Sequence, residues 1–149
     1  MQTFLPYDDF NRTARCLDTK RLGKQRVECL QIYKSLTIST YRWKQHPAVK
    51  MWAGYEFCLL AYALVICEEW IARGYKDTVL KQIQAEYIQQ VIGNDHMLVP
   101  KWFGLAEFHD SHKSALLFKN PTHYGVFNWN VEPKLQYYWP PQEREYACR

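Results

Sequence analysis

The sequence has no long hydrophobic run and no recognisable export signal. A membrane-spanning helix needs about 20 predominantly apolar residues, but the longest apolar run here, residues 58–67, ends at two glutamates. Met1 is followed by Gln2 and Thr3, without the basic stretch and apolar segment of a secretory signal peptide. We therefore expect a cytoplasmic protein that does not associate with a membrane.

Cysteines and histidines are too scattered for a disulfide framework or a zinc site. The five cysteines are odd in number and lack CxxC spacing; they stand at positions 16, 29, 58, 67 and 148. No histidine–cysteine cluster has zinc-finger spacing. Three of the cysteines fall in apolar helical patterns, where a free thiol behaves as a small hydrophobic side chain. We therefore expect no metal and no organic cofactor.

Repeats, low-complexity tracts and linkers are also lacking. The length of 149 residues suits one hydrophobic core, so we expect a single domain spanning residues 1–149. Aromatic residues are plentiful at 16% of the chain. Most of them should fill the core, and the remainder could stack on bases or line a pocket.

Positive charge is concentrated in the first third of the chain. Residues 1–50 contain 10 Lys and Arg against 4 Asp and Glu, a net charge of +6, whereas residues 51–149 contain 9 against 11, a net charge of −2. Such asymmetry is typical of a protein with a polyanionic partner. On charge alone, a solvated basic helix face is an equally good interpretation.

Apolar residues recur at helical spacing along most of the chain, and no segment alternates over the length of a strand. The predicted helices run from a cap at Asp8 or Asp9 to about residue 17, from 18 to about 36, from 48 to 72, from a cap at Asp77 or Thr78 to about 92, and from about 107 to 119. Gly93-Asn94-Asp95 is typical of a turn and Asn120-Pro121 of a helix stop.

The ends of the chain lack this periodicity. Residues 1–7 should be extended, and the tail from Tyr124, rich in proline and aromatic residues, should wrap over the domain as ordered coil. The predicted fold is therefore all-α: one compact helical domain with an irregular N-terminal segment and a Pro/aromatic-rich C-terminal tail.

The segment from Asp18 to Glu28 is the most informative. On a helix, one face would carry two carboxylates, an arginine and an amide, with a lysine stripe beside it: Asp18, Arg21, Gln25 and Glu28, then Lys20 and Lys24. Arg26 lies between apolar positions, where a buried guanidinium needs a carboxylate or a phosphate. Gly23 costs a helix roughly 1 kcal/mol relative to Ala and would let another backbone or a ligand approach. We interpret the segment as a site; the alternative is a set of internal ion pairs.

Two further segments carry polar groups at helix starts. Ser111, His112, Lys113 and Ser114 cluster as hydrogen-bond donors, which phosphate oxygens could accept. A histidine in such a place is otherwise a satisfied structural residue. His46 and Lys50 flank a predicted helix N-terminus, which offers unpaired amides to an anion. A simple turn and helix start is the alternative there.

Together these segments resemble the family of pyrimidine-dimer DNA glycosylases, whose founding member is a phage repair enzyme called endonuclease V. The resemblance rests on LD-x-KRLGKQRVE at residues 17–28, HPAV-x-MW-x-GYE at 46–56 and SH-x-SALL-x-K-x-P-x-HY at 111–124. It is strongest to a bacterial and viral branch of the family. It implies an all-α domain that binds duplex DNA, kinks it and flips a base out of the stack.

The resemblance also implies a chemistry. In the founding enzyme the N-terminal amine attacks the sugar, a glutamate on the first long helix assists, and the resulting Schiff base permits strand cleavage. An α-amine is less protonated near neutral pH than a lysine, and a carboxylate can stabilise the cationic sugar and shuttle protons.

This sequence departs from that scheme at two positions. Because Gln2 is large, we expect Met1 to be retained, so that the nucleophile is its α-amine, a lysine such as Lys24, or water. The position of the family's glutamate corresponds to Gly23. The nearest carboxylates on the same predicted helix, Asp18 and Glu28, are therefore the candidates.

We predict a monomeric DNA repair glycosylase, with AP lyase activity as an option, that removes damaged or modified pyrimidines such as pyrimidine dimers from duplex DNA. It would act at the nucleoid, or in the host cell if viral. The predicted catalytic residues are Asp18, Glu28, Lys24 and Met1. The predicted DNA contacts are Lys20, Arg21, Gln25, Arg26, His46, Lys50, Ser111, His112, Lys113 and Ser114. The alternatives are a non-catalytic DNA-binding module on the same fold, or an enzyme acting on a modified base or nucleotide.

Overall fold

Helices make up most of the chain and confirm the predicted all-α class. The computed structural model describes residues 1–93 and 96–141, and within these ranges no strand is formed. The elements are α1 (Phe10–Cys16), α2 (Thr19–Thr37), α3 (Pro47–Lys50), α4 (Glu56–Ala72), α5 (Leu80–Gly93), α6 (Ala106–Lys119), α7 (Pro121–Tyr124) and the 3₁₀ turn η1 (Gly125–Phe127). Of the predicted turn at 93–95, Gly93 belongs to α5 and the other two residues lie outside the described ranges.

The predicted helix over residues 48–72 is wrong in one respect, because it consists of two helices. α3 ends at Lys50 and α4 begins at Glu56, with turns between them. Gly54 adopts a φ of +87°, a left-handed conformation that cannot continue a helix and that glycine adopts without strain. The Glu56 carboxylate accepts a hydrogen bond from the Gly54 amide at 3.1 Å and so fixes the break.

Polar residues stand at the other helix ends much as the sequence predicts, although the Asp18 side chain makes no capping hydrogen bond. Asp9 caps α1, Asp77 accepts from the amides that lead into α5, and Asp18 is the residue just before α2. The stop at Asn120-Pro121 is confirmed, since α6 ends at Lys119. The same two residues then begin α7, because the Asn120 side chain accepts from a backbone amide of its first turn.

α4 is the centre of the fold, as its composition predicts. It packs against α1, α2 and α5, and its buried residues lie on several sides of the helix: Cys58, Leu59, Leu60, Tyr62, Ala63, Ile66 and Cys67. A helix this apolar is stable only where neighbours cover it. None of the helices in the described part of the chain is long and apolar enough to cross a membrane.

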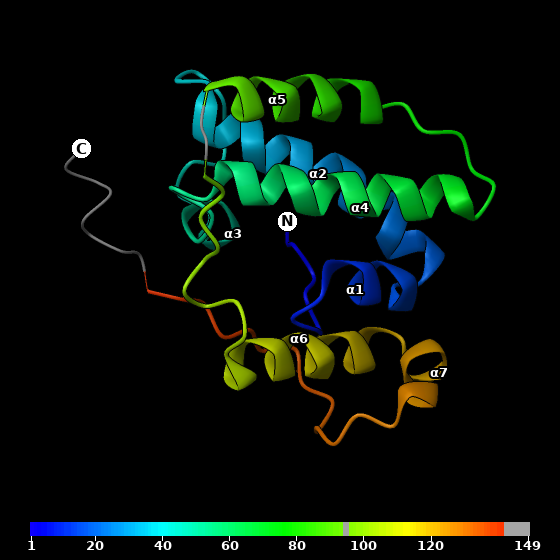
Figure 1. The fold of residues 1–149 in the computed structure, drawn as a ribbon. Coiled ribbons are helices and arrows are strands. Elements are labelled where there is room, and N and C mark those ends of the chain that lie inside the picture. The colour runs from blue at the N-terminus through cyan, green and yellow to red at the C-terminus, as the bar shows by residue number, and fades with distance from the viewer. Residues whose placement is uncertain (94–95, 142–149) are drawn as a thin grey trace.

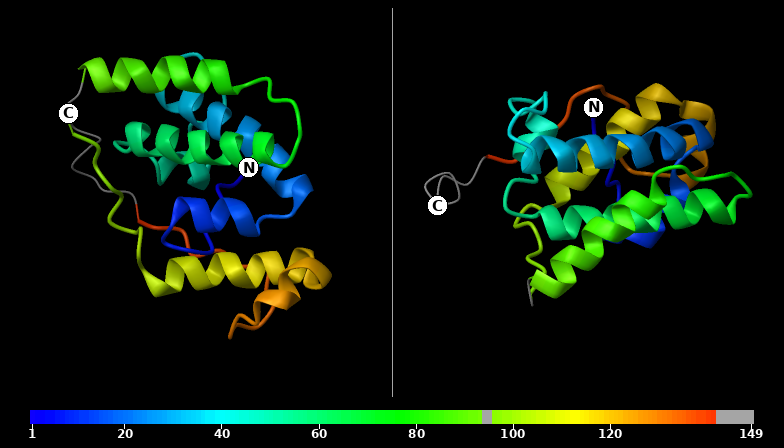
Figure 2. Two further views of the ribbon diagram at one scale, coloured as in Figure 1. Left: turned by 45° about the vertical axis from the view of Figure 1, so that its right-hand side comes forward. Right: turned by 90° about the horizontal axis from the view of Figure 1, so that it is seen from above.

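The N-terminal segment runs through the interior instead of over the surface. In Figures 1 and 2 it lies between the α2–α4 layer on one side and α6 on the other. Thr3 accepts a hydrogen bond from the Trp52 indole at 2.9 Å, and the Phe4 carbonyl accepts one from the Tyr62 hydroxyl at 2.5 Å. The expected extended segment is thus part of the core.

The tail after α7 follows α6 back across the molecule. Lys134 donates its amide to the Ser114 carbonyl at 3.2 Å, and Tyr138 donates its amide to the Ser111 hydroxyl at 3.1 Å. The predicted ordered coil is confirmed for residues 128–141, although Tyr124 still belongs to α7 and η1 follows it.

Candidate active site

The segment before α1 is held by side chains rather than by a β-ladder. Gln25 accepts from the Phe4 amide at 2.8 Å and donates to the Gln2 carbonyl at 2.7 Å. On the opposite side, His112 Nδ1 accepts from the Leu5 amide at 2.9 Å. Buried backbone groups need such partners. Gln25, predicted as a DNA contact, is therefore occupied inside the protein.

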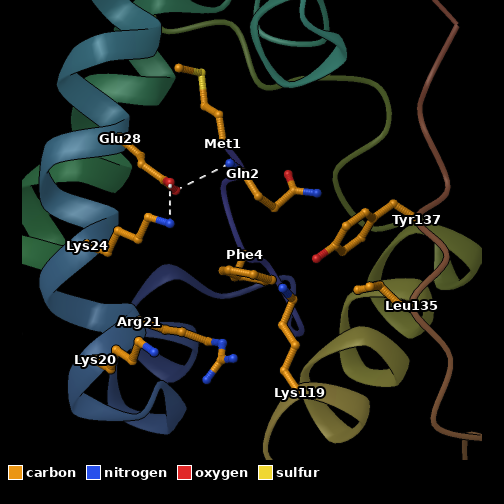
Figure 3. Close-up of a pocket in the computed structure, with 10 residues that line it drawn as sticks. All are labelled: Met1, Gln2, Phe4, Lys20, Arg21, Lys24, Glu28, Lys119, Leu135 and Tyr137. Atoms are coloured by element: carbon orange, nitrogen blue, oxygen red, sulfur yellow. Dashed lines mark hydrogen bonds and ion pairs between the residues drawn. The ribbon is translucent and has the colours of Figure 1, made fainter.

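This segment forms one wall of a pocket of about 400 Å³, a volume typical of ligand sites (Figure 3). The other walls come from α2, the end of α6 and the tail. The lining residues are Met1, Gln2, Phe4, Lys20, Arg21, Lys24, Glu28, Lys119, Leu135 and Tyr137. The predicted site residues that the fold brings together here are Met1, Lys20, Arg21, Lys24 and Glu28.

Glu28 supplies the carboxylate of this pocket. Its Oε2 accepts from the Gln2 amide at 3.3 Å, and its Oε1 lies 3.6 Å from Lys24 Nζ. The Glu28 side chain is 11% exposed, whereas that of Lys24 is 71% exposed. Figure 3 shows the carboxylate beside the first peptide bond of the chain. The amine-bearing residue, the acid and an exposed cation are therefore neighbours.

Four cationic side chains line the same pocket: Lys20, Arg21, Lys24 and Lys119. Burial lowers the pKa of Lys119, and the charges of Arg21 and Lys24 lower it further. A cleft lined by charge of one sign attracts a ligand of the other. Sequence reasoning gave Lys119 no role, although it is the lysine of the third motif; only the fold shows that the end of α6 meets α2.

Asp18, the other predicted carboxylate, serves the fold instead. Its side chain accepts hydrogen bonds from the Tyr124 hydroxyl and, at 3.3 Å, from Arg21. Burial acts to raise the pKa of Asp18, but the hydrogen bond from Tyr124 and the charge of Arg21 outweigh it and lower that pKa below its usual value. The carboxylate is thus held ionised and occupied, and it does not line the pocket.

Gly23 and Arg26 lie on the face of α2 that turns away from the pocket. A Cβ at Gly23 would stand 2.8 Å from the Trp70 ring, so the close approach inferred from this glycine is made by an indole and not by a ligand. Arg26 donates to Asp77 at 2.8 Å and lies over Trp70, 4.5 Å from the ring centroid. The carboxylate that Arg26 needs is supplied by Asp77, just before α5, and not by Asp18 or Glu28 on its own segment.

The donors predicted on the last long helix do not reach the pocket. His112 is fully buried. Burial, with a smaller contribution from the charge of the neighbouring His109, lowers the pKa of His112 to about 3, so the side chain is neutral. Lys113 pairs with Asp110 at 3.7 Å. Ser111 and Ser114 line a different hollow of the surface, together with the tail. These residues position the N-terminal segment and the tail.

His46 lies near the site but is used as a cap. Its Nδ1 accepts from the Ala48 amide at 3.0 Å, so the N-terminus of α3 is already occupied by a side chain. Burial lowers the pKa of His46, and the charge of the N-terminal amine lowers it further. His46 therefore faces the start of the chain. Lys50, at the end of α3, does not line the pocket.

Metal ligation does not explain these groupings. No set of three or more histidine, cysteine, aspartate or glutamate side chains in the described ranges could hold a metal ion. The described cysteines are buried, and burial raises the pKa of Cys16 to about 12 and that of Cys58 to about 11. These thiols remain protonated and belong to the core.

A helical protein in which an amine, a carboxylate and several cations meet in one pocket belongs to a class suited to covalent or acid–base chemistry on an anionic substrate. Residues 1–83, more than half of the 149, match the family model described as pyrimidine dimer DNA glycosylase. The chain belongs to this family, which confirms the family resemblance and implies glycosylase action on DNA. No curated protein and no solved structure matches the chain.

The matched range covers only part of the pocket. It includes the N-terminal segment and α2 up to Glu28, whereas Lys119, Leu135 and Tyr137 lie beyond it. The assignment to a bacterial and viral branch stays a prediction.

Proposed function

We propose that the protein excises damaged pyrimidines, pyrimidine dimers among them, from duplex DNA, with the Met1 α-amine as nucleophile and Glu28 as the acid–base carboxylate. One observation carries the proposal. The Glu28 carboxylate accepts a hydrogen bond from the Gln2 amide in a cation-lined pocket, directly beside the residue that bears the amine. Asp18, its rival, is bound by Tyr124 and Arg21.

The order of events follows from the groups present. The amine attacks C1′ of the sugar as the C1′–N1 bond to the base breaks, and Glu28 accepts the proton that the amine loses. The sugar ring then opens: the C1′–O4′ bond breaks, O4′ takes a proton from water, and the nitrogen lone pair forms the imine that links Met1 to C1′. This imine would permit strand cleavage, an AP lyase step. Lys24 and Lys119 are the rival nucleophiles, because both are amines in the same pocket.

The cations would serve the DNA backbone. Lys20, Arg21 and Lys24 lie along the first turns of α2, where they can contact the phosphates next to a flipped nucleotide. Phe4 and Tyr137 offer aromatic rings to the base. We further propose that the protein acts on DNA as a monomer.

The deciding experiment incubates the purified protein with UV-irradiated or undamaged duplex, with and without borohydride. We expect cleavage of the glycosidic bond, measured as base release after photoreversal of the dimers, and a borohydride-trapped adduct from the irradiated duplex alone. Peptide mapping of the adduct should place the sugar on the N-terminal peptide; attachment to Lys24 or Lys119 would overturn the assignment of the nucleophile. Intact mass establishes which residue carries the α-amine, since loss of Met1 would transfer the role to Gln2.

Two carboxamide variants form a matched pair. Glu28→Gln should abolish trapping, whereas Asp18→Asn should lower stability and keep trapping by the folded fraction. Absence of base release and trapping in the wild type would refute the enzyme. If the wild-type protein lacked both activities but bound DNA tightly with a steep salt dependence, it would be a non-catalytic DNA-binding module.

A further inference from the structure

Every polar group of Gln2 except its side-chain NH₂ group makes a hydrogen bond within the protein. Its amide donates to Glu28 at 3.3 Å, its carbonyl accepts from Gln25 at 2.7 Å, and its side-chain Oε1 accepts from the Thr3 amide at 2.9 Å. Gln2 is 5% exposed, and its Nε2 has no hydrogen-bond partner among the described residues. Buried polar groups left unpaired are rare, and each needs an explanation, such as a catalytic role or a bound group that completes it.

The direction of this free donor is fixed by its neighbours. The Thr3 amide requires an acceptor, so Oε1 must face Thr3 and the NH₂ group must point the other way. Figure 3 shows the side chain extending from the N-terminal segment toward Tyr137, within the pocket that both residues line. The wall of the pocket therefore contains a preoriented, unpaired hydrogen-bond donor.

Tyr137 adds a second donor on the same side. Burial raises the pKa of Tyr137 to about 12, with Arg21 opposing that rise, so the hydroxyl stays protonated. A pocket with two donors on this wall suits a ring that carries carbonyl oxygens. Pyrimidines have such a carbonyl at C2, the ring carbon next to the nitrogen that bears the sugar.

We propose that the Gln2 side-chain amide donates a hydrogen bond to the O2 carbonyl of the departing pyrimidine and stabilises it as a leaving group. This inference rests on the proposed function. When the C1′–N1 bond breaks, its electron pair stays with the base and spreads from N1 onto O2, and a preoriented donor at O2 stabilises that charge. The Met1 lone pair forms the new bond to C1′. The proton lost by the amine passes first to Glu28 and then to N1 of the base, while Gln2 keeps its protons.

The position of Gln2 suits this role. Residue 2 follows the residue that bears the attacking amine, and O2 is the carbonyl oxygen nearest the sugar carbon under attack. The amine and the amide would thus act on opposite ends of one breaking bond, with Glu28 fixing the peptide between them.

The test separates base departure from imine formation. Gln2→Met and Gln2→Glu remove the donor and keep a large second residue, and intact mass verifies that Met1 is retained. Each variant is given UV-irradiated duplex and a duplex with an abasic site, which has no base to expel. We expect base release to fall about 100-fold and borohydride trapping on the abasic duplex to stay unchanged. Gln84→Met, on the exposed side of α5, is the matched control.

Each outcome decides the matter. Equal loss on both substrates would mean that Gln2 only positions the N-terminus, and unchanged base release would mean that the donor is not used; either overturns the inference and leaves the glycosylase in place. A wild-type protein that neither releases base nor traps on the abasic site would refute the proposed function itself, and the inference with it.

Discussion

Gly23 shows how a single residue can be constrained by a distant side chain. The Trp70 ring occupies the space where a Cβ would stand, at 2.8 Å and 2.9 Å from two of its carbons. Trp70 cannot easily retreat, because its indole donates to the Lys76 carbonyl at 2.9 Å and its ring stacks on Tyr75 with centroids 4.3 Å apart. Helix propensity therefore favours alanine at this position, whereas packing favours glycine.

We expect packing to win. Gly23→Ala gains about 1 kcal/mol in helix propensity, but overpacking against a fixed ring costs about 1–3 kcal/mol. The free energy of unfolding of this variant, measured with urea, should therefore be no higher than that of the wild type. In a Trp70→Leu background the same substitution should become stabilising, a coupling that a double-mutant cycle detects. A Gly23→Ala protein more stable than wild type would contradict this account.

At the scale of the element, α2 divides its charges between two faces. One face presents Lys20 and Lys24 to the pocket, and the other holds Arg26 against Asp77 with side-chain exposures of 11% and 3%. Neighbouring cations on one helix thus have different environments. Sequence periodicity placed them on one segment but could not show which face was covered.

Substitutions on the two faces should differ in kind. Arg26→Met removes the cation that pairs with the buried Asp77 carboxylate and leaves it only the Val79 and Leu80 amides as donors. It should therefore cost about 3–5 kcal/mol of stability while the folded fraction keeps its DNA affinity. Lys24→Ala should leave stability nearly unchanged and lower the slope of log K against log salt by about one. Unfolding curves and DNA titrations at several salt concentrations measure both. A reduced salt slope in Arg26→Met would show that Arg26 meets phosphate after all.

The helices and the most important segment of the site could be predicted from local pattern. The break at Gly54 was missed because apolar residues continue through it, and conformation at one glycine decides it. Lys119 and Tyr137 enter the pocket from elements about a hundred residues after α2, and no local pattern reports such contacts. Between Asp18 and Glu28, hydrogen bonding alone distinguishes the structural carboxylate from the one in the pocket.

At the scale of the molecule, two histidines of α6 hold the N-terminal segment. His112 Nδ1 accepts from the Leu5 amide at 2.9 Å, and His109 Nδ1 lies 2.7 Å from the Leu5 carbonyl. Burial lowers the pKa of both histidines, that of His112 to about 3. The fold therefore binds them in the neutral form, whereas an unfolded chain would protonate them near pH 6.5.

Acid should weaken the protein for this reason. As the pH falls below about 6.5, these histidines become protonated in the unfolded state but stay neutral in the folded state. The free energy of unfolding should therefore fall by up to about 1.4 kcal/mol per pH unit for each histidine. Urea unfolding between pH 7 and pH 4 measures the slope. His112→Asn should reduce it, although the variant is less stable at pH 7. A free energy of unfolding of the wild type that does not change between pH 7 and pH 4 would contradict the assignment of both histidines as neutral in the folded state.

The same long-range contacts bear on how the protein is made. The Leu5 amide and His112, and the Asp18 amide and Tyr124, are 107 and 106 residues apart in the chain. A ribosome releases residues 5 and 18 first, and the side chains that bond them are synthesised more than a hundred residues later. The N-terminal segment therefore lacks these contacts until α6 and α7 have left the exit tunnel. Activity should therefore appear only after α6 and α7 have been synthesised.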